Sequence, residues 1–508
     1  MIEEWKKLCK SFTLKRLINL LRLTAPDFMP QSDSLSSYLR DSERFSMAEQ
    51  IGVIEYTDAQ TVIAGAVQVK GELTDRSSKR EQYDLAKRIL KSGNHNAGIF
   101  IFYDDASCFR LSLITVAYHG MQRQFSSYRR HTFFVDPRLP NKTFLQQMGR
   151  ADFSDLAGLL ETFSLEAVSN EFYKEFKPKF DALSDTVQGT DDKDLKQDFA
   201  LLFAIRIIFL GFVQKKEWLG GNPKFLQCFW QEYLQSGSTD TFYREWLNPL
   251  FFEALSSPPG GVVAYGHAPF SQEIQTSLQM APYLNGELFK QKQGVDDQGL
   301  SIPDQIIGDF FDFLFQYNFT VEENELFDEE LELNPEFLGI IFERLTNMDQ
   351  GAVYTPRVEV DLMCRLALIQ WLEQTTKIDV KDLYHLFFRD SGAAEAYDEH
   401  QRQGDFSTAE IRILVKQLER VTICDPAAGS GAFEVGMLQV LEQTLANLYS
   451  RNNTPAELKA EAPAPFERKK AIIANSLYGA EVKRWAVWIN HLRLWLALFV
   501  DMPQENKS

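Results

Sequence analysis

The chain has 508 residues, of which 44% are hydrophobic and 24% are charged, so it has the composition of a globular protein of roughly two to four domains. Its formal net charge of −18 excludes binding to a polyanion over the whole surface, so any contact with nucleic acid needs a local basic patch or lies outside this chain. The five cysteines form no CxxC pair and the seven histidines no HExxH motif, which argues for a reducing compartment and against a zinc site.

Neither a secretory signal nor a membrane span is predicted. The lysines near the N-terminus are not followed by an apolar segment. Two apolar runs, 199–213 and 485–500, carry the charged residues Arg206 and Arg493, so we interpret both runs as buried helices. We therefore expect a cytoplasmic protein with no membrane partner.

The first third of the chain shows the pattern of a mixed α/β domain. Residues 1–24 are predicted to form one or two helices, and a Ser-rich loop follows at 31–37. An amphipathic helix is predicted over 79–90, and it is flanked by strand-like runs at 51–56, 61–70, 98–103, 109–116 and 131–135. This pattern predicts an α/β domain over residues 1–154.

The end of the second strand-like run raises the question of a nuclease. Gln68-x-Lys70 resembles a degenerate form of the PD-(D/E)xK motif of restriction nucleases, in which two acidic residues hold Mg²⁺ and a lysine acts on the attacking water. Glu55 and Asp58 are the upstream carboxylates that this motif would need. Because a glutamine stands at the second acidic position, we favour a surface lysine at a strand end, and Mg²⁺ is expected only if the domain is an active nuclease.

Two basic clusters are the local candidates for contact with DNA phosphates. Each cluster also fits a solvated helix or hairpin face. The first comprises Arg76, Lys79, Arg80, Lys87, Arg88 and Lys91, and the second interleaves Arg123, Arg129 and Arg130 with Phe125 and Tyr128.

The middle of the chain, residues 155–345, is predicted to be a helical connector. Large apolar residues recur at helical spacing in 201–213, 226–233, 242–254, 307–317 and 335–345. An acidic stretch from Glu322 to Glu332 is expected to be solvated.

The run from Val421 to Phe433, VTICDPAAGSGAF, organises the C-terminal third. It predicts a short buried strand that ends at Asp425, then a tight turn allowed by Gly429 and Gly431, and then a helix. Strand, glycine turn and helix place backbone N–H groups against a bound nucleotide. The third glycine of a dinucleotide motif and the Gly-Lys-Ser/Thr of a P-loop are both missing.

Asp425 narrows the choice of nucleotide, because a carboxylate at this place repels phosphate and suits a cationic amino group. The run resembles the first motif of the amino-methyltransferases that use S-adenosyl-L-methionine. That resemblance implies that the cofactor is bound by Asp425, Pro426, Ala427, Gly429, Ser430 and Gly431.

Two further motifs agree with this resemblance. Thr355 can cap a helix whose first turn holds Pro356. Together with Tyr354 these residues resemble the Tyr-Thr-Pro motif that contacts the methionine end of the cofactor. A second short strand is predicted at 476–481 and ends in Glu481, and an acid at that position hydrogen-bonds ribose hydroxyls in nucleotide folds. Between the two strands, Asn452 to Pro465 is expected to be a disordered connector.

The order of these motifs is that of the γ-type adenine methyltransferases, and most of the chain resembles the Eco57I-like (type IIG-like) restriction-modification enzymes. The resemblance implies an α/β fold: a mixed α/β N-terminal domain, a helical connector and, over residues 346–508, the cofactor-binding half of a Rossmann-like methyltransferase domain. It implies methylation of adenine N6 in double-stranded DNA, in a restriction-modification or phage-defence system. The alternative is a non-catalytic DNA-binding or assembly subunit that retains a cofactor fold.

The loop that holds the flipped adenine in this family, Asn/Asp-Pro-Pro-Tyr/Phe, is not found in the sequence, so we assign no catalytic residue. We expect a downstream polypeptide or a continuation of the chain to carry that loop and a target-recognition domain. The helix predicted over 482–500 is apolar nearly all round. We expect strands from that downstream sequence to cover it, and we expect it to be exposed in the isolated chain.

Overall fold

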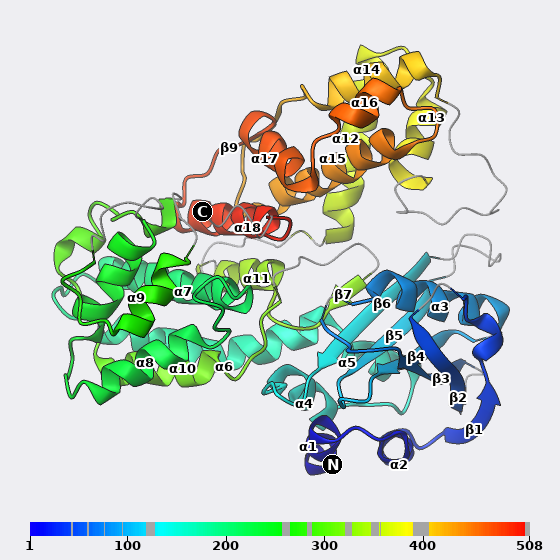
Figure 1. Ribbon diagram of the computed structural model, residues 1–508, viewed down its shortest axis with the longest axis horizontal. Coiled ribbons are helices and arrows are strands. Elements are labelled where there is room, and N and C mark those ends of the chain that lie inside the picture. The colour runs from blue at the N-terminus through cyan, green and yellow to red at the C-terminus, as the bar shows by residue number, and fades with distance from the viewer. Residues whose placement is uncertain are drawn as a thin grey trace.

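The computed structural model describes residues 1–41, 44–57, 60–75, 77–93, 95–117, 127–256, 265–281, 287–320, 328–346, 355, 357–389 and 406–502. They form an N-terminal α/β region, a helical region and a C-terminal lobe (Figure 1). The N-terminal and helical regions share one apolar core, and the C-terminal lobe has a separate one.

The N-terminal region is built on a seven-stranded sheet with the strand order β1-β2-β3-β4-β5-β6-β7. Neighbouring strands are antiparallel, except that β3 is parallel to β4 and β6 to β7. The strands are β1 (Phe28–Ser34), β2 (Phe45–Glu55), β3 (Thr61–Val69), β4 (Ala97–Tyr103), β5 (Phe109–Ala117), β6 (Ser127–Val135) and β7 (Asp328–Glu330).

Both faces of this sheet are covered, because apolar side chains point alternately to its two sides. On β4, Ile99 and Ile101 join the side packed by α1 (Ile2–Lys10), α2 (Leu14–Thr24) and α4 (Lys142–Gly149). Phe100 and Phe102 join the other side, which α3 (Lys79–Ser92) and the short helix η1 (Ser36–Tyr38) cover. The predicted α/β pattern of this region is therefore confirmed.

The helical region is formed by α5 (Leu156–Thr162), α6 (Leu165–Thr186), α7 (Lys193–Lys215), α8 (Phe225–Gln235), η3 (Phe242–Leu247), η4 (Leu250–Ala254), α9 (Gln272–Gln279), η5 (Glu287–Phe289), η6 (Asp296–Gln298), α10 (Asp304–Leu314) and α11 (Pro335–Thr346). Among the described residues, α7 is long and apolar enough to span a membrane, but it is almost entirely buried in the protein core. Its buried Arg206 pairs with Asp296, with two nitrogen–oxygen distances of 2.7 Å. The prediction of a buried helix is confirmed.

The C-terminal lobe contains α12 (Arg357–Thr375), α13 (Val380–Tyr384), η7 (His385–Arg389), α14 (Thr408–Leu418), β8 (Ile423–Asp425), α15 (Ala432–Ser450), α16 (Ala456–Glu461), α17 (Pro465–Asn475), β9 (Leu477–Gly479) and α18 (Arg484–Phe499). The segment predicted to be disordered, 452–465, instead contains α16. Leu458 packs against the core of the lobe, and Arg412 of α14 pairs with Glu457, so α16 is tied down by its neighbours.

Two segments in which no strand was predicted contain strands. β1 lies partly in the Ser-rich stretch and pairs with β2 although nearly all of its residues are exposed, so it has no buried face for an alternating pattern to reveal. β7 lies in the acidic stretch that was predicted to be solvated, and it pairs with β6 at the edge of the N-terminal sheet. The division at residues 154 and 345 stays a prediction.

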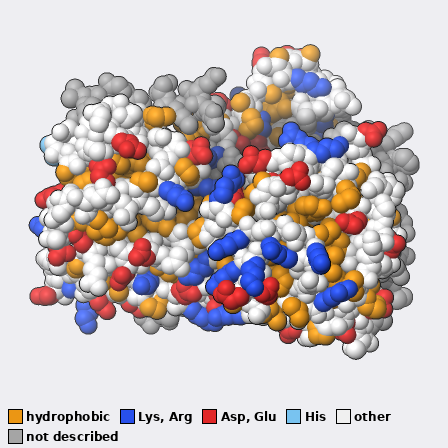
Figure 2. Space-filling view, turned by 60° about the horizontal axis from the view of Figure 1, so that its bottom comes forward, with side chains coloured by type: hydrophobic (Ala, Val, Ile, Leu, Met, Phe, Trp, Pro, Cys, Tyr) orange, Lys and Arg blue, Asp and Glu red, His pale blue; other side chains and the backbone are white. Residues whose placement is uncertain are grey.

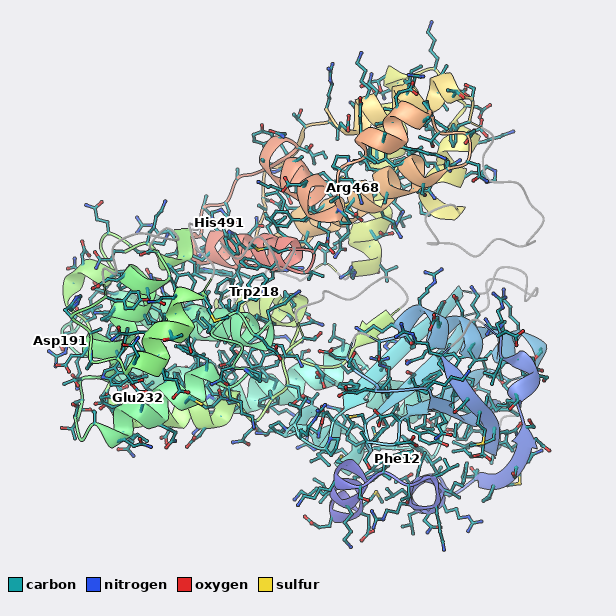
Figure 3. The ribbon with its side chains drawn as sticks, in the orientation of Figure 1. Phe12, Asp191, Trp218, Glu232, Arg468 and His491 are labelled. Carbon is teal, nitrogen blue, oxygen red and sulfur yellow. The ribbon has the colours of Figure 1, made fainter. Side chains whose placement is uncertain are left out.

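The last helix, α18, is covered by the helical region of the same chain, so the prediction that it needs downstream strands and is exposed without them is wrong. Trp488, Ile489 and Leu492 belong to the core shared with the helical region, where α18 packs against α7 and α11. The ring of Trp218 lies 4.4 Å from that of Phe499. Figure 3 shows Trp218 on the side of the helical region and Arg468 of α17 on the other side of α18.

Candidate functional site

The two strands of the C-terminal lobe are parallel and end at the same edge. Ile423 pairs with Leu477 and Asp425 with Gly479. The pairing continues beyond the strands, where the N–H of Ala480 donates to the carbonyl of Asp425 at 2.9 Å. The strand, turn and helix predicted around Asp425 and the strand before Glu481 are confirmed, but β8, which was predicted to be buried, is half-buried to exposed. Two parallel strands joined through helices form a βαβ unit.

The turn between β8 and α15 depends on its glycines. Gly429 and Gly431 have φ angles of 55° and 84°, in the left-handed region that other residues avoid. An ideal Cβ on Gly431 would lie 2.3 Å from Oδ1 of Asn490, so no side chain fits there. Around Gly429 the nearest such neighbour is the carbonyl oxygen of Ala427 at 3.9 Å, so this part of the loop is open to an approaching ligand.

The carboxylates of Asp425 and Glu481 meet at this loop. Oδ1 of Asp425 accepts a hydrogen bond from the N–H of Ala427 at 2.9 Å. Oε2 of Glu481 accepts one from the N–H of Gly429 at 2.9 Å, and its Oε1 accepts one from the N–H of Lys483 at 2.8 Å. Both side chains are partly exposed, so they shape the loop and still face solvent. The structure therefore brings together two acidic residues that are 56 positions apart in the sequence.

The Tyr-Thr-Pro motif is only partly visible. Tyr354 and Pro356 lie outside the described residues, and Thr355 is half-buried directly before α12. α12 packs on α15, where an ideal Cβ on Gly436 would lie 2.5 Å from Cγ1 of Val360. The helix that follows Thr355 is thus fixed beside the helix that follows the glycine turn.

A cavity of about 270 Å³ lies beside the loop, between α12, α15 and the two strands. Its lining is mostly apolar, and the acidic members are Asp425 and Glu434. The full set is Met363, Cys364, Ala367, Ile423, Cys424, Asp425, Pro426, Phe433, Glu434, Met437, Leu477 and Tyr478.

Glu434 was missed in the sequence analysis. It is only 5% exposed, and its carboxylate lies beside the side-chain amide of Asn490 without a well-formed hydrogen bond. Burial raises the pKa of Glu434 to about 7, and the nearby charge of Asp425 adds to the rise. No sequence signal separates it from the many glutamates in the first turns of helices, which are ordinarily exposed and complement the helix dipole.

The nuclease residues considered in the N-terminal region do not converge. Glu55 pairs with Thr61 at the start of β3, whereas Gln68 lies at the other end of that strand, about 23 Å away at the usual rise per residue. Asp58 lies outside the described residues. No group of three or more His, Cys, Asp or Glu side chains in the described part of the chain is arranged to hold a metal ion.

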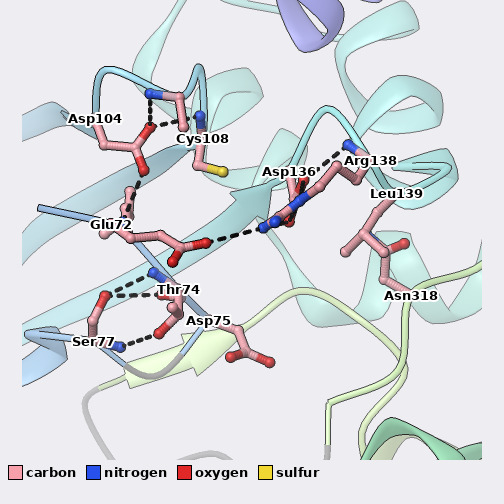
Figure 4. Close-up of polar contacts among 12 residues, drawn as sticks. Glu72, Thr74, Asp75, Ser77, Asp104, Cys108, Asp136, Arg138, Leu139 and Asn318 are labelled. Atoms are coloured by element: carbon pink, nitrogen blue, oxygen red, sulfur yellow. Dashed lines mark hydrogen bonds and ion pairs between the residues drawn. The ribbon is translucent and has the colours of Figure 1, made fainter. Parts of the chain in front are cut away.

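Gln68 itself donates a hydrogen bond to Oδ1 of Asp105 at 2.9 Å. The acidic side chains that follow β4 and β6 hold loops (Figure 4). Asp104, which follows β4, accepts hydrogen bonds from the N–H groups of Leu73, Ala106 and Cys108 at 2.8 to 2.9 Å. Asp136, which follows β6, accepts hydrogen bonds from Arg138 through the backbone and the guanidinium group.

Among the described members of the predicted basic clusters, Arg130 and Arg88 donate hydrogen bonds to backbone carbonyl groups. Arg130 is buried and donates to the carbonyl of Lys79 at 3.0 Å, so it is a core residue and the expectation of a phosphate contact there is wrong. Arg88 donates to the carbonyl of Tyr38 at 3.1 Å. Arg76, Arg123 and Phe125 lie outside the described residues. On the face in Figure 2, lysine and arginine side chains gather along the middle of the molecule, interspersed with acidic ones.

Comparisons with known proteins agree on one class of enzyme. Residues 397–507 match the protein family described as MmeI, DNA-methyltransferase domain. A type II restriction enzyme and methyltransferase of Methanocaldococcus jannaschii is 29% identical over 377 residues, which cover 67% of this chain and 30% of that protein. The chain thus corresponds to about 30% of the length of this curated relative.

Among solved structures, the type IIL restriction-modification enzyme MmeI in complex with DNA aligns with 66% of this chain and 36% of its own, at 15% identity. The TM-score of 0.38 is too low to support an argument about fold. The family match covers the glycine turn, Glu481 and α18. Most of the chain is therefore similar to part of a type II restriction enzyme and methyltransferase, and residues 397–507 of its C-terminal lobe match a DNA-methyltransferase domain.

Proposed function

We propose that this chain supplies the cofactor-binding half of an adenine-specific DNA methyltransferase in a restriction-modification system, with S-adenosyl-L-methionine as its cofactor. The observation that carries the proposal is the convergence of Asp425 and Glu481 on one open glycine turn at the edge of two parallel strands. The match of residues 397–507 to a DNA-methyltransferase domain supports it.

The site has the chemistry that this cofactor needs. Asp425 uses Oδ1 to hold the loop, which leaves Oδ2 for the ammonium group of the methionine part. Each oxygen of Glu481 accepts one hydrogen bond from the backbone and keeps capacity for the ribose hydroxyls. The open space at Gly429 lets a ligand approach the backbone, and Thr355 stands before the adjoining helix. When bound, the cofactor supplies the activated methyl group.

The exposure of β8 and β9 favours the packing of a further segment against them. Among the described residues β8 pairs with β9 alone, and Cys424 on β8 and Tyr478 on β9 are exposed. Parallel strands are ordinarily buried on both faces. Met363 of α12, which lines the apolar cavity, is also exposed, as is Leu366 of the same helix.

We therefore propose that a segment carrying an Asn-Pro-Pro-Tyr loop packs along the free edge of β8, where it adds the pocket for a flipped adenine of double-stranded DNA. It is either a second polypeptide or a continuation of this one, and it brings target recognition.

Two measurements test the function. The 508-residue chain should bind labelled S-adenosylmethionine in equilibrium dialysis, and co-expression with a segment carrying that loop should give methylation of adenine N6 in DNA. Binding without methylation by the completed pair would favour the assembly-subunit alternative. If neither the chain nor the completed pair binds the cofactor, the proposal is wrong.

A further inference from the structure

The cofactor loop rests on a helix that the helical region holds in place. Most of the large apolar side chains of α18 are buried in the core of the helical region, and the middle of that helix lies against the glycine turn through Asn490 and Arg493. Its C-terminal end is fixed from two sides, because Lys216 donates to the carbonyl of Val500 at 3.0 Å and Lys469 to that of Ala497 at 3.1 Å. The position of α18 is thus set by contacts outside the strand–turn–helix unit.

Arg493 extends from α18 into the underside of the loop. Its side chain is 3% exposed, and Nη1 donates a buried hydrogen bond to the carbonyl of Ser430 at 3.2 Å. The same side chain lies against α11, since an ideal Cβ on Gly339 would be 3.5 Å from Cδ and Nη1 of Arg493 and 3.6 Å from Oγ of Ser430. α11, α18 and the loop therefore meet at one guanidinium group.

Asn490 supports the next residue of the loop. Its amide occupies the space that a side chain at position 431 would need, as the 2.3 Å distance from an ideal Cβ on Gly431 shows. Gly431 donates its N–H to the carbonyl of Ala428 at 2.9 Å and caps α15 in a left-handed conformation. Two consecutive loop residues are thus held by two α18 side chains one helical turn apart.

We propose that Arg493 is a positioning residue of the cofactor site. By fixing the carbonyl of Ser430, it holds the loop in the conformation that leaves Gly429 open and keeps Glu481 bonded to the N–H of Gly429. Any movement of α11 or α18 relative to β8 and α15 would be transmitted to the loop through the guanidinium group of Arg493. The inference rests on the proposed function as far as cofactor affinity is concerned, but its effect on the loop itself can be measured without a ligand.

The test compares Arg493→Ala and Arg493→Lys with Arg468→Ala in the full chain. Arg468 is the matched control, because it is also buried in this lobe and donates to a backbone carbonyl, that of Pro463, whereas its other hydrogen bond goes to Glu442 of α15, outside the loop. The readouts are hydrogen–deuterium exchange of the peptide 425–434, affinity for S-adenosylmethionine by calorimetry, and thermal unfolding.

For Arg493→Ala we expect exchange in this peptide to rise and cofactor affinity to fall, each about tenfold, as when a charge-assisted hydrogen bond is lost. Arg493→Lys should restore part of the protection against exchange and part of the cofactor affinity, since an ammonium group can still donate a hydrogen bond. Arg468→Ala should lower the unfolding temperature without changing the loop exchange or the cofactor affinity.

Unchanged loop exchange in Arg493→Ala, or an equal rise in Arg468→Ala, would overturn the proposal. Wild-type protein that binds no cofactor would count against the proposed function, while loop exchange would still decide the role of Arg493.

Discussion

The two sheets of this protein differ in how completely the chain covers them. In the N-terminal sheet, central strands such as β4 are buried on both faces, with α1, α2 and α4 on one side and α3 on the other. In the C-terminal lobe, β8 and β9 are parallel strands that remain half-buried or exposed along their whole length. The first sheet is covered on both faces, and apart from β7 its strands come from the first third of the chain. The second sheet presents an edge, a cavity and two acidic residues to its surroundings.

From this contrast we expect residues that determine stability and residues that determine ligand binding to lie in different sheets. Substitutions in the N-terminal sheet should change the free energy of unfolding and leave ligand affinity alone. Substitutions around β8 should change affinity or pH dependence more than global stability. The predictions below test that division, from the largest expected effect to the smallest.

Phe100→Ala should destabilise the N-terminal region by about 3–5 kcal/mol, which is the usual cost of removing a buried phenylalanine. Phe100 is fully buried, and its ring fills the space left by Gly65 and Gly98, whose ideal Cβ atoms would lie 3.0 and 2.4 Å from it. Urea unfolding followed by circular dichroism measures the loss. Phe100→Leu, which refills part of the cavity, should lose less. A drop in cofactor affinity of the folded variant would contradict the division.

Glu434→Gln should change how stability depends on pH. The pKa of this carboxyl rises from 4.5 in the unfolded chain to about 7 in the native state, so between these values only the native state holds the proton. Its contribution to stability is complete below pH 4.5 and is lost as the pH rises to about 7, a total of about 3 kcal/mol. The glutamine variant should therefore lose less stability than the wild type between pH 5 and pH 8 in urea titrations. Glu373→Gln, at an exposed position of α12, should leave the wild-type slope in place.

Asp425→Ala should weaken binding of S-adenosylmethionine by about ten- to hundredfold, which corresponds to losing one hydrogen bond to a charged group, about 1.5–3 kcal/mol. Calorimetric titration gives the dissociation constant. Asp425→Asn keeps the acceptor for the N–H of Ala427 and isolates the effect of charge. An unchanged constant in both variants would remove Asp425 from the cofactor site.

Lys70→Ala should change the free energy of unfolding by less than about 0.5 kcal/mol, because Lys70 is an exposed residue at the end of β3. It also tests whether the N-terminal domain is a nuclease. We expect no cleavage of plasmid by the completed wild-type enzyme with Mg²⁺, since Glu55 lies far from Gln68. Cleavage that disappears in Lys70→Ala while methylation persists would show that other residues complete a nuclease site.

Local pattern predicted the parts of the site that depend on neighbours in sequence. β8, the glycine turn and α15 follow directly from a short apolar run, two glycines and helical spacing, because strand, turn and helix are each decided within a few residues. Strand β9 before Glu481 and helix α3 were likewise predicted from local sequence pattern. Glu434 could not be predicted in this way, because its raised pKa comes from burial under elements that are far away in the sequence.

The sequence by itself therefore determined strands β2 to β6 and helix α3 of the N-terminal region, in their order along the chain, and the identity of the loop that carries Asp425. Only the tertiary structure decided that the helical region covers α18 and that β7 joins the N-terminal sheet. It also decided that Arg130 is buried, and that Glu55 on β2 lies opposite the start of β3, far from Lys70 at its end. The physical reason is the same in each case. Hydrophobicity and turn residues specify that a segment must be covered or must turn, but which distant surface covers it depends on packing among elements that lie far apart in the chain.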